Sequence, residues 1–368
     1  MSEQTSAIPM PPPAARVSET QRLLTRDHTR FMTLCAGLLI VAPLLVMWAA
    51  SQGAMSLSLE ALWQSVTGTD NTDANLQMKV MWEIRLPRVL MSLITGAGLA
   101  ICGAVMQGIC RNPLADPGLI GVSSGAALFA AVVMVFGGAM GLPAVLQPLL
   151  LPIAAFTGAL VVSMLVFRLA RTTSGINTLL LILAGVAINA LVGTLMGLLA
   201  YVADDGTLRL ITFWSMGSYA GANWQQVGLV ALGVGFPATL MWRYKTELTL
   251  MLSGEQEAKY LGVPVQKVKS YSLFAVALLT ACCVCFTGIV GFVGLVTPHI
   301  CRMVVGPDLR KLLPLSALTG AFLVGSADTL ARILIIPSEL PVGIVTSCLG
   351  VPFFLYLLLR ERKGQYHV

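Results

Sequence analysis

The chain of 368 residues is 56% hydrophobic and only 11% charged, with a formal net charge of +6. A soluble domain would carry about 25% charged residues, and the mean hydropathy here is +0.82. Apolar runs of about twenty residues recur throughout, which suits a hydrocarbon core of about 30 Å. The alternating pattern of an outer-membrane barrel is missing, and no basic run interleaves with aromatic residues, which argues against nucleic-acid binding. Composition therefore predicts an all-α polytopic protein in a lipid bilayer.

Ten apolar segments form the expected membrane domain, residues 31–361. The segments are 31–50, 88–110, 118–138, 145–168, 178–202, 226–243, 270–291, 292–305, 312–334 and 340–360. Residues 1–30 contain three consecutive prolines and four arginines, and no signal cleavage site is recognisable. We expect them to form a disordered cytoplasmic tail, with residues 362–368 as a second, short cytoplasmic tail.

The positive charges indicate the orientation of these spans. An even number of spans places both termini on one side of the membrane. Of the 23 lysines and arginines, the opposite side would then hold only Lys79, Arg85, Arg88, Arg209 and Arg332. Because lysine and arginine concentrate in cytoplasmic loops, we predict that both termini are cytoplasmic, together with the loop between the sixth and seventh spans.

That loop contains an unusually polar segment, SGEQEAKYLGVP, at residues 253–264. Ser253 and Gln256 have the spacing of a capping box, Gly262 is a C-terminal stop, and Pro264 prevents continuation. The pattern predicts a helix of about nine residues, roughly 13 Å long. Such a helix between two spans indicates a binding site for a soluble partner.

A second short helix is expected after the fifth span, at residues 207–216. Asp205 or Thr207 can cap its start, and Gly217 can end it. On the side opposite the termini, this helix is either a packing plug or a gate at the outer mouth of a pathway.

Three arginines lie at span ends on that same side: Arg85, Arg88 and Arg332. Asp328 and Arg332 have the i, i+4 spacing of an ion pair on one helical face. The arginines could also extend toward lipid headgroups. As a third alternative, they could bind an acidic patch on an extracytoplasmic protein.

The chain is not expected to be an enzyme. His28, His299 and His367 are far apart in the sequence and form no catalytic triad or metal site. The phosphate-binding pattern GxxxxGK[ST] is missing. If the chain belongs to an ATP-driven machine, ATP is hydrolysed by another polypeptide.

Several ordered motifs resemble the permease subunits of type II ABC importers for iron-siderophores, haem and vitamin B12. The resemblance covers residues 31–361. The motifs are RLPR (85–88), GAVMQGICRNPLADPGLIGVSSGAAL (103–128), LAGVAIN (183–189), SGEQEAKYLGV (253–263), GFVGLVTPHICR (291–302), ADTLAR (327–332) and ELPVGIVTSCLGVPFFLYLLLR (339–360).

This resemblance implies the type II permease fold and a homodimer with the pathway at its interface. It implies two cytoplasmic ATPase subunits that use ATP and Mg, a periplasmic substrate-binding protein and a place in the bacterial inner membrane. No permanently bound cofactor or metal is implied for the permease itself.

The resemblance also assigns roles to residues. Residues 253–263 match the coupling helix that binds the ATPase, and Arg85, Arg88 and Arg332 match the arginines that dock the binding protein. The coupling residues are Ser253, Gly254, Glu255, Gln256, Ala258, Leu261 and Gly262. The cytoplasmic gate is Asn177 and Thr178, and the periplasmic gate is Thr207, Leu210, Phe213 and Trp214. Asn189 and Met196 are expected to line the pathway.

The motif details are most similar to the haem branch. The vitamin B12 branch tends to have Glu in place of Asp116, and siderophore permeases often have Asn-Ala in place of Ser123 and Ser124. We therefore expect haem as the cargo, with a ferric siderophore or cobalamin as the alternatives. An ion-coupled secondary transporter is the alternative from another class, but it would need ionisable residues within the spans. Asp328 is the main one there.

Overall fold

The computed structural model describes residues 13–53, 72–141, 143, 146–336 and 338–365. The described helices are α1 (Pro13–Ser51), α3 (Thr72–Lys79), α4 (Leu86–Cys110), α5 (Val122–Phe136), α6 (Gln147–Leu169), α7 (Thr178–Val202), α8 (Asp205–Ser215), α9 (Trp224–Arg243), α10 (Lys245–Leu250), α11 (Glu255–Tyr260), α12 (Val265–Thr287), α13 (Val293–Val305), α14 (Leu309–Ile333) and α15 (Val342–Gln365). A π-helical turn, η1 (Val80–Arg85), joins α3 to α4. Strands β1 (Arg171–Thr172) and β2 (Gly175–Ile176) pair antiparallel between α6 and α7.

Each of the ten predicted spans corresponds to one apolar helix. Within the described residues, six helices are long and apolar enough to cross a membrane, and α9 with α10 makes a seventh candidate bent by 59°. Three shorter apolar helices, α5, α13 and the first part of α15, account for the remaining segments. Helices suit this environment because each one satisfies its own backbone hydrogen bonds. The prediction of an all-α polytopic protein is confirmed.

The helix boundaries differ from the expected ones in three places. Helix α1 begins at Pro13, so residues 13–30, expected to be disordered, are helical. The second span extends backward without a break through η1 and α3 to Thr72. At the other end of the chain, α15 continues to Gln365, into the segment expected to be a tail.

Helix α4 is the centre of the bundle and packs against α9, α12, α13 and α14. Its small residues permit close approach: Gly96 faces the backbone of Gly320, and Gly103 faces that of Gly294. Such positions let helix backbones come together in a membrane. By contrast, Gly193 and Gly197 on α7 have nothing near them. These two glycines therefore do not mediate close packing among the described residues.

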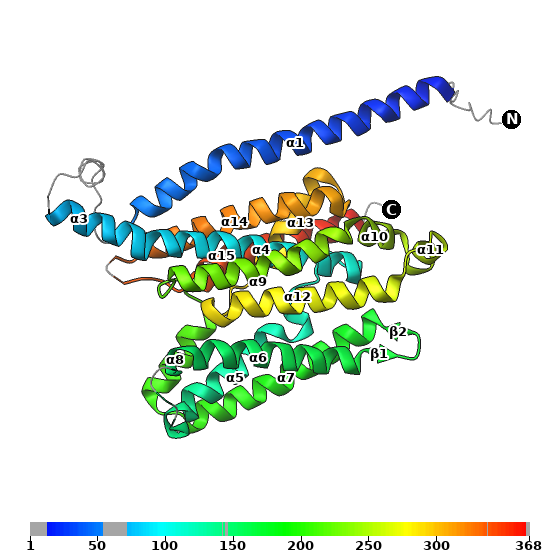
Figure 1. Ribbon diagram of the computed structural model, residues 1–368. Helices are drawn as coiled ribbons and strands as arrows, with labels where there is room; N and C mark the ends of the chain where they lie inside the picture. Colours follow the sequence, from blue (N-terminus) through cyan, green and yellow to red (C-terminus); the bar gives the residue numbers. More distant parts are fainter. Residues whose placement is uncertain (1–12, 54–71, 142, 144–145, 337, 366–368) are drawn as a thin grey trace.

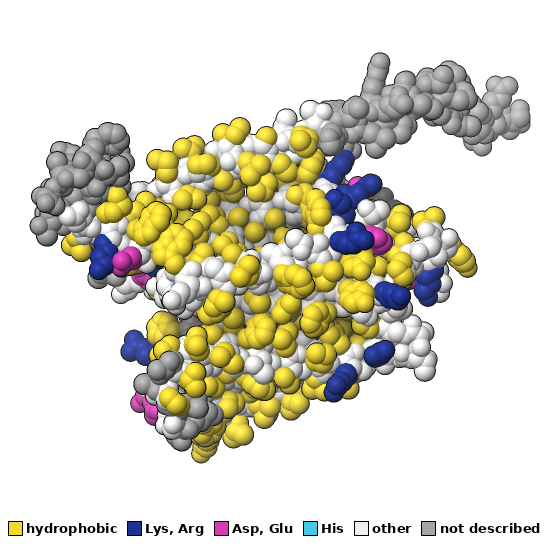
Figure 2. Space-filling model, in the orientation of Figure 1, with side chains coloured by type: hydrophobic (Ala, Val, Ile, Leu, Met, Phe, Trp, Pro, Cys, Tyr) yellow, Lys and Arg dark blue, Asp and Glu magenta, His cyan; other side chains and the backbone are white. Residues whose placement is uncertain are grey.

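The bundle has two ends, defined by the short helices that lie there (Figure 1). The α8 end contains α3, α8 and the start of α15. The α11 end contains α10, α11 and the hairpin β1–β2, and the start of α1 and the end of α15 lie on this side. Figure 2 shows a broad hydrophobic surface between the ends, with most visible lysines and arginines gathered at the α11 end.

Aromatic side chains flank the hydrophobic surface at both ends. At the α8 end, the rings of Trp82 and Trp224 are 5.4 Å apart, and the Trp224 indole N–H donates to the carbonyl of Trp82 at 2.9 Å. At the α11 end, Lys245 lies over the ring of Trp242, 4.0 Å from its centroid. Tryptophan is enriched at membrane–water interfaces, so these residues mark the edges of the membrane-embedded part.

Candidate functional site: the two ends of the helical bundle

The helix α11 lies where the sequence predicted a short polar helix, but its start differs. It comprises six residues and begins at Glu255, with Gly254 in the N-cap position at φ 142°. Ser253 instead ends a preceding 3-10 turn, so the predicted capping box of Ser253 and Gln256 was wrong. A side chain at Gly254 would collide with the Glu257 carboxylate. The third helical residue thus folds back toward the N-cap, and glycine is required there by both space and backbone conformation.

The end of α11 follows the sequence prediction. The N–H of Val263 donates to the carbonyl of Ala258, and the N–H of Gly262 donates to that of Lys259. These two bonds, with Gly262 at φ +83°, form a Schellman motif. The helix is anchored by Ala258, which is fully buried. On its outer side, Tyr260 is 88% exposed and Leu261 is 66% exposed, so the helix presents apolar side chains away from the bundle.

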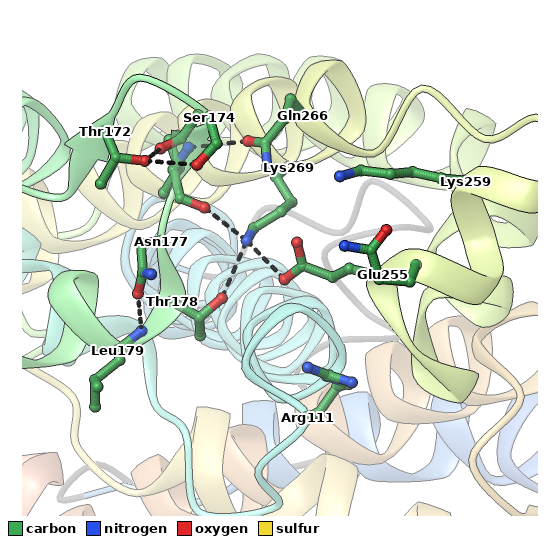
Figure 3. A pocket seen from close by; sticks show the side chains of 13 residues that line it. Arg111, Thr172, Ser174, Asn177, Thr178, Leu179, Glu255, Lys259, Gln266 and Lys269 are labelled. Atoms are coloured by element: carbon green, nitrogen blue, oxygen red, sulfur yellow. Dashed lines mark hydrogen bonds and ion pairs between the residues drawn. The ribbon is translucent and has the colours of Figure 1, made fainter.

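A polar cavity of about 390 Å³ lies beside α11, between it, α12 and the α6–α7 connection (Figure 3). Its lining includes Arg111, Thr172, Ser174, Gly175, Ile176, Asn177, Thr178, Leu179, Glu255, Gln256, Lys259, Gln266 and Lys269. Two of the predicted coupling residues, Glu255 and Gln256, therefore line one cavity with both residues of the predicted cytoplasmic gate.

Lys269 on α12 joins these two groups, and sequence reasoning did not single it out. Its ammonium donates to the Glu255 carboxylate at 2.9 Å, to the Ile176 carbonyl at 2.8 Å and to the Thr178 hydroxyl at 3.1 Å. The available signal was a lysine inside the first turns of an otherwise apolar helix. Such a residue needs a partner.

The predicted gate residue Asn177 has a clear structural role at the start of α7. Its side-chain oxygen accepts hydrogen bonds from the backbone N–H groups of Leu179 and Leu180. Its own N–H donates to the carbonyl of Ala170 at 3.0 Å and closes the hairpin. Thus Asn177 is the N-cap of α7, and Thr178 is the first helical residue.

At the α8 end, the structure brings together all three arginines expected to dock a partner, but it buries them. Arg85 is 5% exposed, Arg88 is 7% and Arg332 is 5%. Arg85 donates to the carbonyls of Ala50 and Ser51 at 2.8 Å. Arg332 on α14 donates to the carbonyls of Ala49 and Gln52. Arg85 and Arg332 therefore tie η1 and α14 to the end of α1 rather than forming a free surface patch.

Two carboxylates complete this cluster. Asp328, 1% exposed, accepts from Arg88 Nη2 at 2.9 Å and lies 3.3 Å from Arg332 Nε. Glu339, with a side chain 44% exposed, accepts from Arg88 Nη1 at 2.7 Å. The predicted i, i+4 pair of Asp328 and Arg332 is confirmed. We refer to Arg85, Arg88, Asp328, Arg332 and Glu339 as the arginine cluster.

The expectation that these arginines are accessible to an acidic partner is not met, because their guanidinium groups are already bonded within the chain. The arginine cluster also bears on ion coupling. Asp328, the main carboxylate within the expected spans, is compensated by two arginines. Its negative charge is already paired within the chain, which argues against Asp328 as the binding site of a coupling ion.

Helix α8 has the predicted position and a different cap. Asp204 accepts from the N–H of Thr207 at 2.9 Å and from its hydroxyl at 2.8 Å. Neither Asp205 nor Thr207 is therefore the cap that the sequence suggested. Leu210 and Phe213 are 62% and 49% exposed, whereas Trp214 is partly buried.

The end of α8 is connected to two other elements by backbone hydrogen bonds. Met216 and Gly217 accept from the N–H groups of Gly343 and Val342 at the start of α15. Ser218 donates to the carbonyl of Thr287 at the end of α12. A displacement of α8 would therefore be transmitted to α12 and α15 through these backbone hydrogen bonds.

The two residues expected to line a pathway, Asn189 and Met196, are partly buried and make contacts within the chain. The Asn189 side chain accepts from Ser124 at 2.6 Å and donates to the carbonyl of Gly118 at 3.2 Å. Met196 packs with Ala131 and Ile211 in a small apolar cluster. Both side chains contact elements that neighbour α7, and their assignment as lining residues stays a prediction. Among the described residues, no group of three His, Cys, Asp or Glu side chains could hold a metal ion.

The fold and the two bundle ends define the class: an all-α, multi-pass transport permease rather than an ATPase. The chain belongs to the FecCD transport family, whose profile matches residues 38–360. It is an ABC importer permease, and this family works with an ATPase and a substrate-binding protein.

Individual relatives differ in the cargo that their names give. The chain is 45% identical to the hemin transport system permease protein HmuU of Yersinia pestis, over 89% of this chain and 95% of that protein. It is 39% identical to the vitamin B12 import system permease protein BtuC of Vibrio cholerae, over 79% and 86%. A solved structure of a metal-chelate type ABC transporter in an inward-facing conformation matches with a TM-score of 0.76 and 32% identity. It covers 89% of this chain and 99% of the other.

Proposed function

We propose that this chain is the permease of an ATP-driven haem importer in the bacterial inner membrane. Two copies form a homodimer around the pathway, two ATPase subunits bind at the α11 end, and a periplasmic binding protein delivers cargo at the α8 end. Alternating access is driven from outside the chain, as ATP binding and hydrolysis move α11. The 45% identity to a hemin permease supports haem over a ferric siderophore or cobalamin.

The exposed apolar surface of α11 is the observation that carries the ATPase-binding role. Tyr260 and Leu261 lie at the tip of a helix that extends from a polar end of the bundle. A large aromatic residue and a leucine that are exposed in this position are typical anchors of a protein interface. The gathering of lysines and arginines at this end (Figure 2) supports a cytoplasmic location. This agrees with an ATPase partner.

Docking of the binding protein at the α8 end needs accessible cations, because the arginine cluster is buried. Arg209 on α8 is exposed and lies over Phe213, 5.7 Å from the ring centroid. Lys79 is also exposed and makes only a long pair with Glu83 at 3.9 Å. We assign the first electrostatic contact with an acidic partner to these two residues, with the periplasmic gate (Thr207, Leu210, Phe213 and Trp214) beside them.

Reconstitution tests the proposal. The permease, its cognate ATPase and its cognate binding protein are placed in liposomes, and uptake of haem, a ferric hydroxamate and cobalamin is measured with ATP inside. We expect ATP-dependent haem uptake that requires the binding protein, and loss of ATPase co-purification in the Y260D L261D variant. Uptake of cobalamin or the hydroxamate, without uptake of haem, would overturn the assignment of haem as the cargo. Uptake without any ATPase would overturn the mechanism.

A further inference from the structure

The side chain of Lys269 is buried to an extent that is unusual for lysine. It is 1% exposed, although it lies near the start of α12 and close to the aqueous α11 end. Lysine is almost never fully buried unless it is paired, because removing an ammonium group from water is costly. Lys267, two residues earlier on the same helix, is exposed. Position near the helix start therefore does not by itself bury a lysine here.

All three N–H donors of this ammonium are used, and they reach two separate segments. An ammonium group has three donors and no acceptor. One bonds Glu255, the first residue of α11, while the others bond Ile176 and Thr178 in the connection to α7. Figure 3 shows the ammonium between these groups. A single side chain of α12 thus holds the coupling helix and the expected gate together.

A second side chain of α12 holds the gate segment from the same face. Gln266, one turn before Lys269, accepts from the N–H of Ile176 at 2.9 Å. The peptide groups on both sides of Ile176 are therefore bonded to α12, because its carbonyl accepts from Lys269. The chain passes so close to Gln266 that a side chain at Gly175 would overlap it. The turn before α7 is consequently attached to α12 as well as to α6.

The attachment of α11 is different, because its polar link to this assembly depends on Glu255. The chain between α11 and α12 contains Gly262 in a left-handed conformation and then Pro264. Ala258 supplies apolar contact beneath the helix. Among the described residues, the ion pair of Glu255 with Lys269 is the salt bridge that links α11 to the rest of the chain.

We propose that Lys269 is a positioning residue that makes α11 and the α6–α7 connection move as one body. Through it, a displacement of α11 is passed, together with the start of α12 that carries Lys269, to Asn177 and Thr178 at the start of α7. This inference rests on the proposed function, in which α11 is moved by an ATPase. It adds a residue and a route that the motif resemblance does not assign.

Transport coupling in the full complex gives the first test. K269M removes the charge and all three donors while retaining length, E255Q removes the charge of the partner, and K267M is the matched control on the same helix. We expect K269M and E255Q each to reduce cargo moved per ATP hydrolysed on the order of tenfold, a usual size for coupling between sites. The double variant should be no worse than either single one, and K267M should resemble the wild type.

A distance measurement separates relay from simple structural support. Spin labels at Ser174 and Gln256, both exposed positions, report the separation of the α6–α7 connection from α11. In the wild type, we expect the same distance with and without ATP, because the two segments move together. In K269M the distance should differ between the two states.

The outcomes distinguish the relay from the proposed function. If the wild-type complex transports cargo and K269M and E255Q transport it equally well per ATP, the relay is wrong while the importer stands. A wild-type label distance that changes with ATP also overturns the relay. Loss of the ATPase from purified K269M would overturn it too, since Lys269 would then only maintain the ATPase-binding surface. Failure of wild-type transport would instead contradict the proposed function.

Discussion

The two ends of the bundle both contain buried ion pairs, but these pairs connect different kinds of elements. At the α8 end, the arginine cluster joins α4 and α14, which are long central helices, and Asp328 is enclosed between two arginines. At the α11 end, Lys269 joins a long helix to two short segments, and its partner Glu255 has a side chain 27% exposed. The ion pairs at the α8 end stabilise the contact between α4 and α14, which already pack against each other. The α11-end pair links segments that have few other contacts.

This difference indicates that the two ends of the bundle differ in how readily their elements move. A buried charge network between long helices resists displacement, because separating the charges would leave at least one of them unpaired in an apolar interior. In the pair at the α11 end only Lys269 is fully buried, and the Glu255 side chain is 27% exposed, so water can compensate the carboxylate in part when the helix moves. We infer that rigid support is concentrated at the arginine cluster and that the mobile linkage is at Lys269.

The largest expected effect tests the rigid end. D328N keeps the shape of the side chain but removes the only carboxylate that Arg88 and Arg332 share within the described part of the chain. Leaving buried cations without their counter-ion costs about 3–5 kcal/mol, so we expect a loss of this size in the free energy of unfolding. Chemical denaturation of the purified protein in detergent measures it.

The matched control for that change lies on the same arginine. Glu339 also bonds Arg88, but its side chain is 44% exposed, so water can replace it. E339Q should therefore cost at most about 1 kcal/mol, as exposed pairs do. Equal losses of unfolding free energy in D328N and E339Q would show that burial does not decide how much each ion pair contributes. The proposed contrast between the two ends of the bundle would then be wrong.

The sequence was informative about the helices and the ends of α8 and α11, for physical reasons that are local. Apolar length predicts a span whatever its neighbours are, and Gly217 and Gly262 end their helices because the left-handed conformation suits glycine. Side-chain partners that are distant in sequence could not be predicted in this way. Lys269 bonds Ile176, and Arg88 bonds Glu339, only because the fold brings those segments together.

The same reasoning explains why the burial of the arginines was not predicted. The motif resemblance placed Arg85, Arg88 and Arg332 on one side of the membrane, but it could not show that carbonyl groups of α1 and a carboxylate of α14 already accept their hydrogen bonds. The resemblance placed Asn189 in the pathway, and this stays a prediction. Its bonds to Ser124 and to the carbonyl of Gly118 could not be predicted, because those partners are distant in sequence.

An intermediate effect is expected at the mobile end. Gly175 has φ +113°, and a Cβ there would overlap Gln266. G175A should therefore push β2 away from α12 and weaken the bonds of Ile176 to Gln266 and Lys269, at a cost of about 1–3 kcal/mol from strain and overpacking. Hydrogen exchange should show faster exchange at the Ile176 amide, with little change in α4 and α14.

The control for this substitution is G193A on α7, where nothing lies near the added methyl group. This change should leave exchange at Ile176 unaltered. If G175A also left it unaltered, the hairpin would not be held by α12, and the linkage at the α11 end would depend on Thr178 alone.

The smallest expected effect concerns the N-cap of α8. It tests whether Asp204 or the neighbouring Asp205 caps this helix. Hydrogen bonds from Thr207, first from its N–H and then from its hydroxyl, hold the pKa of Asp204 below its ordinary value. A carboxylate with a lowered pKa in the folded state stabilises that state above its unfolded pKa, and this stabilisation is lost as pH falls through the folded pKa. The first turn of α8 should therefore loosen only in acid, below the ordinary aspartate pKa of about 4.

A spin label at Leu210, an exposed residue of α8, would report this loosening as increased mobility. D204A should raise the mobility at neutral pH as well as in acid, because the acceptor for the Thr207 N–H is gone. D204N keeps an acceptor oxygen and should make the mobility independent of pH. D205A removes the neighbouring carboxylate, which accepts no capping bond, and should resemble the wild type. If D205A instead matched D204A, the favourable effect of negative charge at the helix start, rather than the specific bond to Thr207, would stabilise this end of α8.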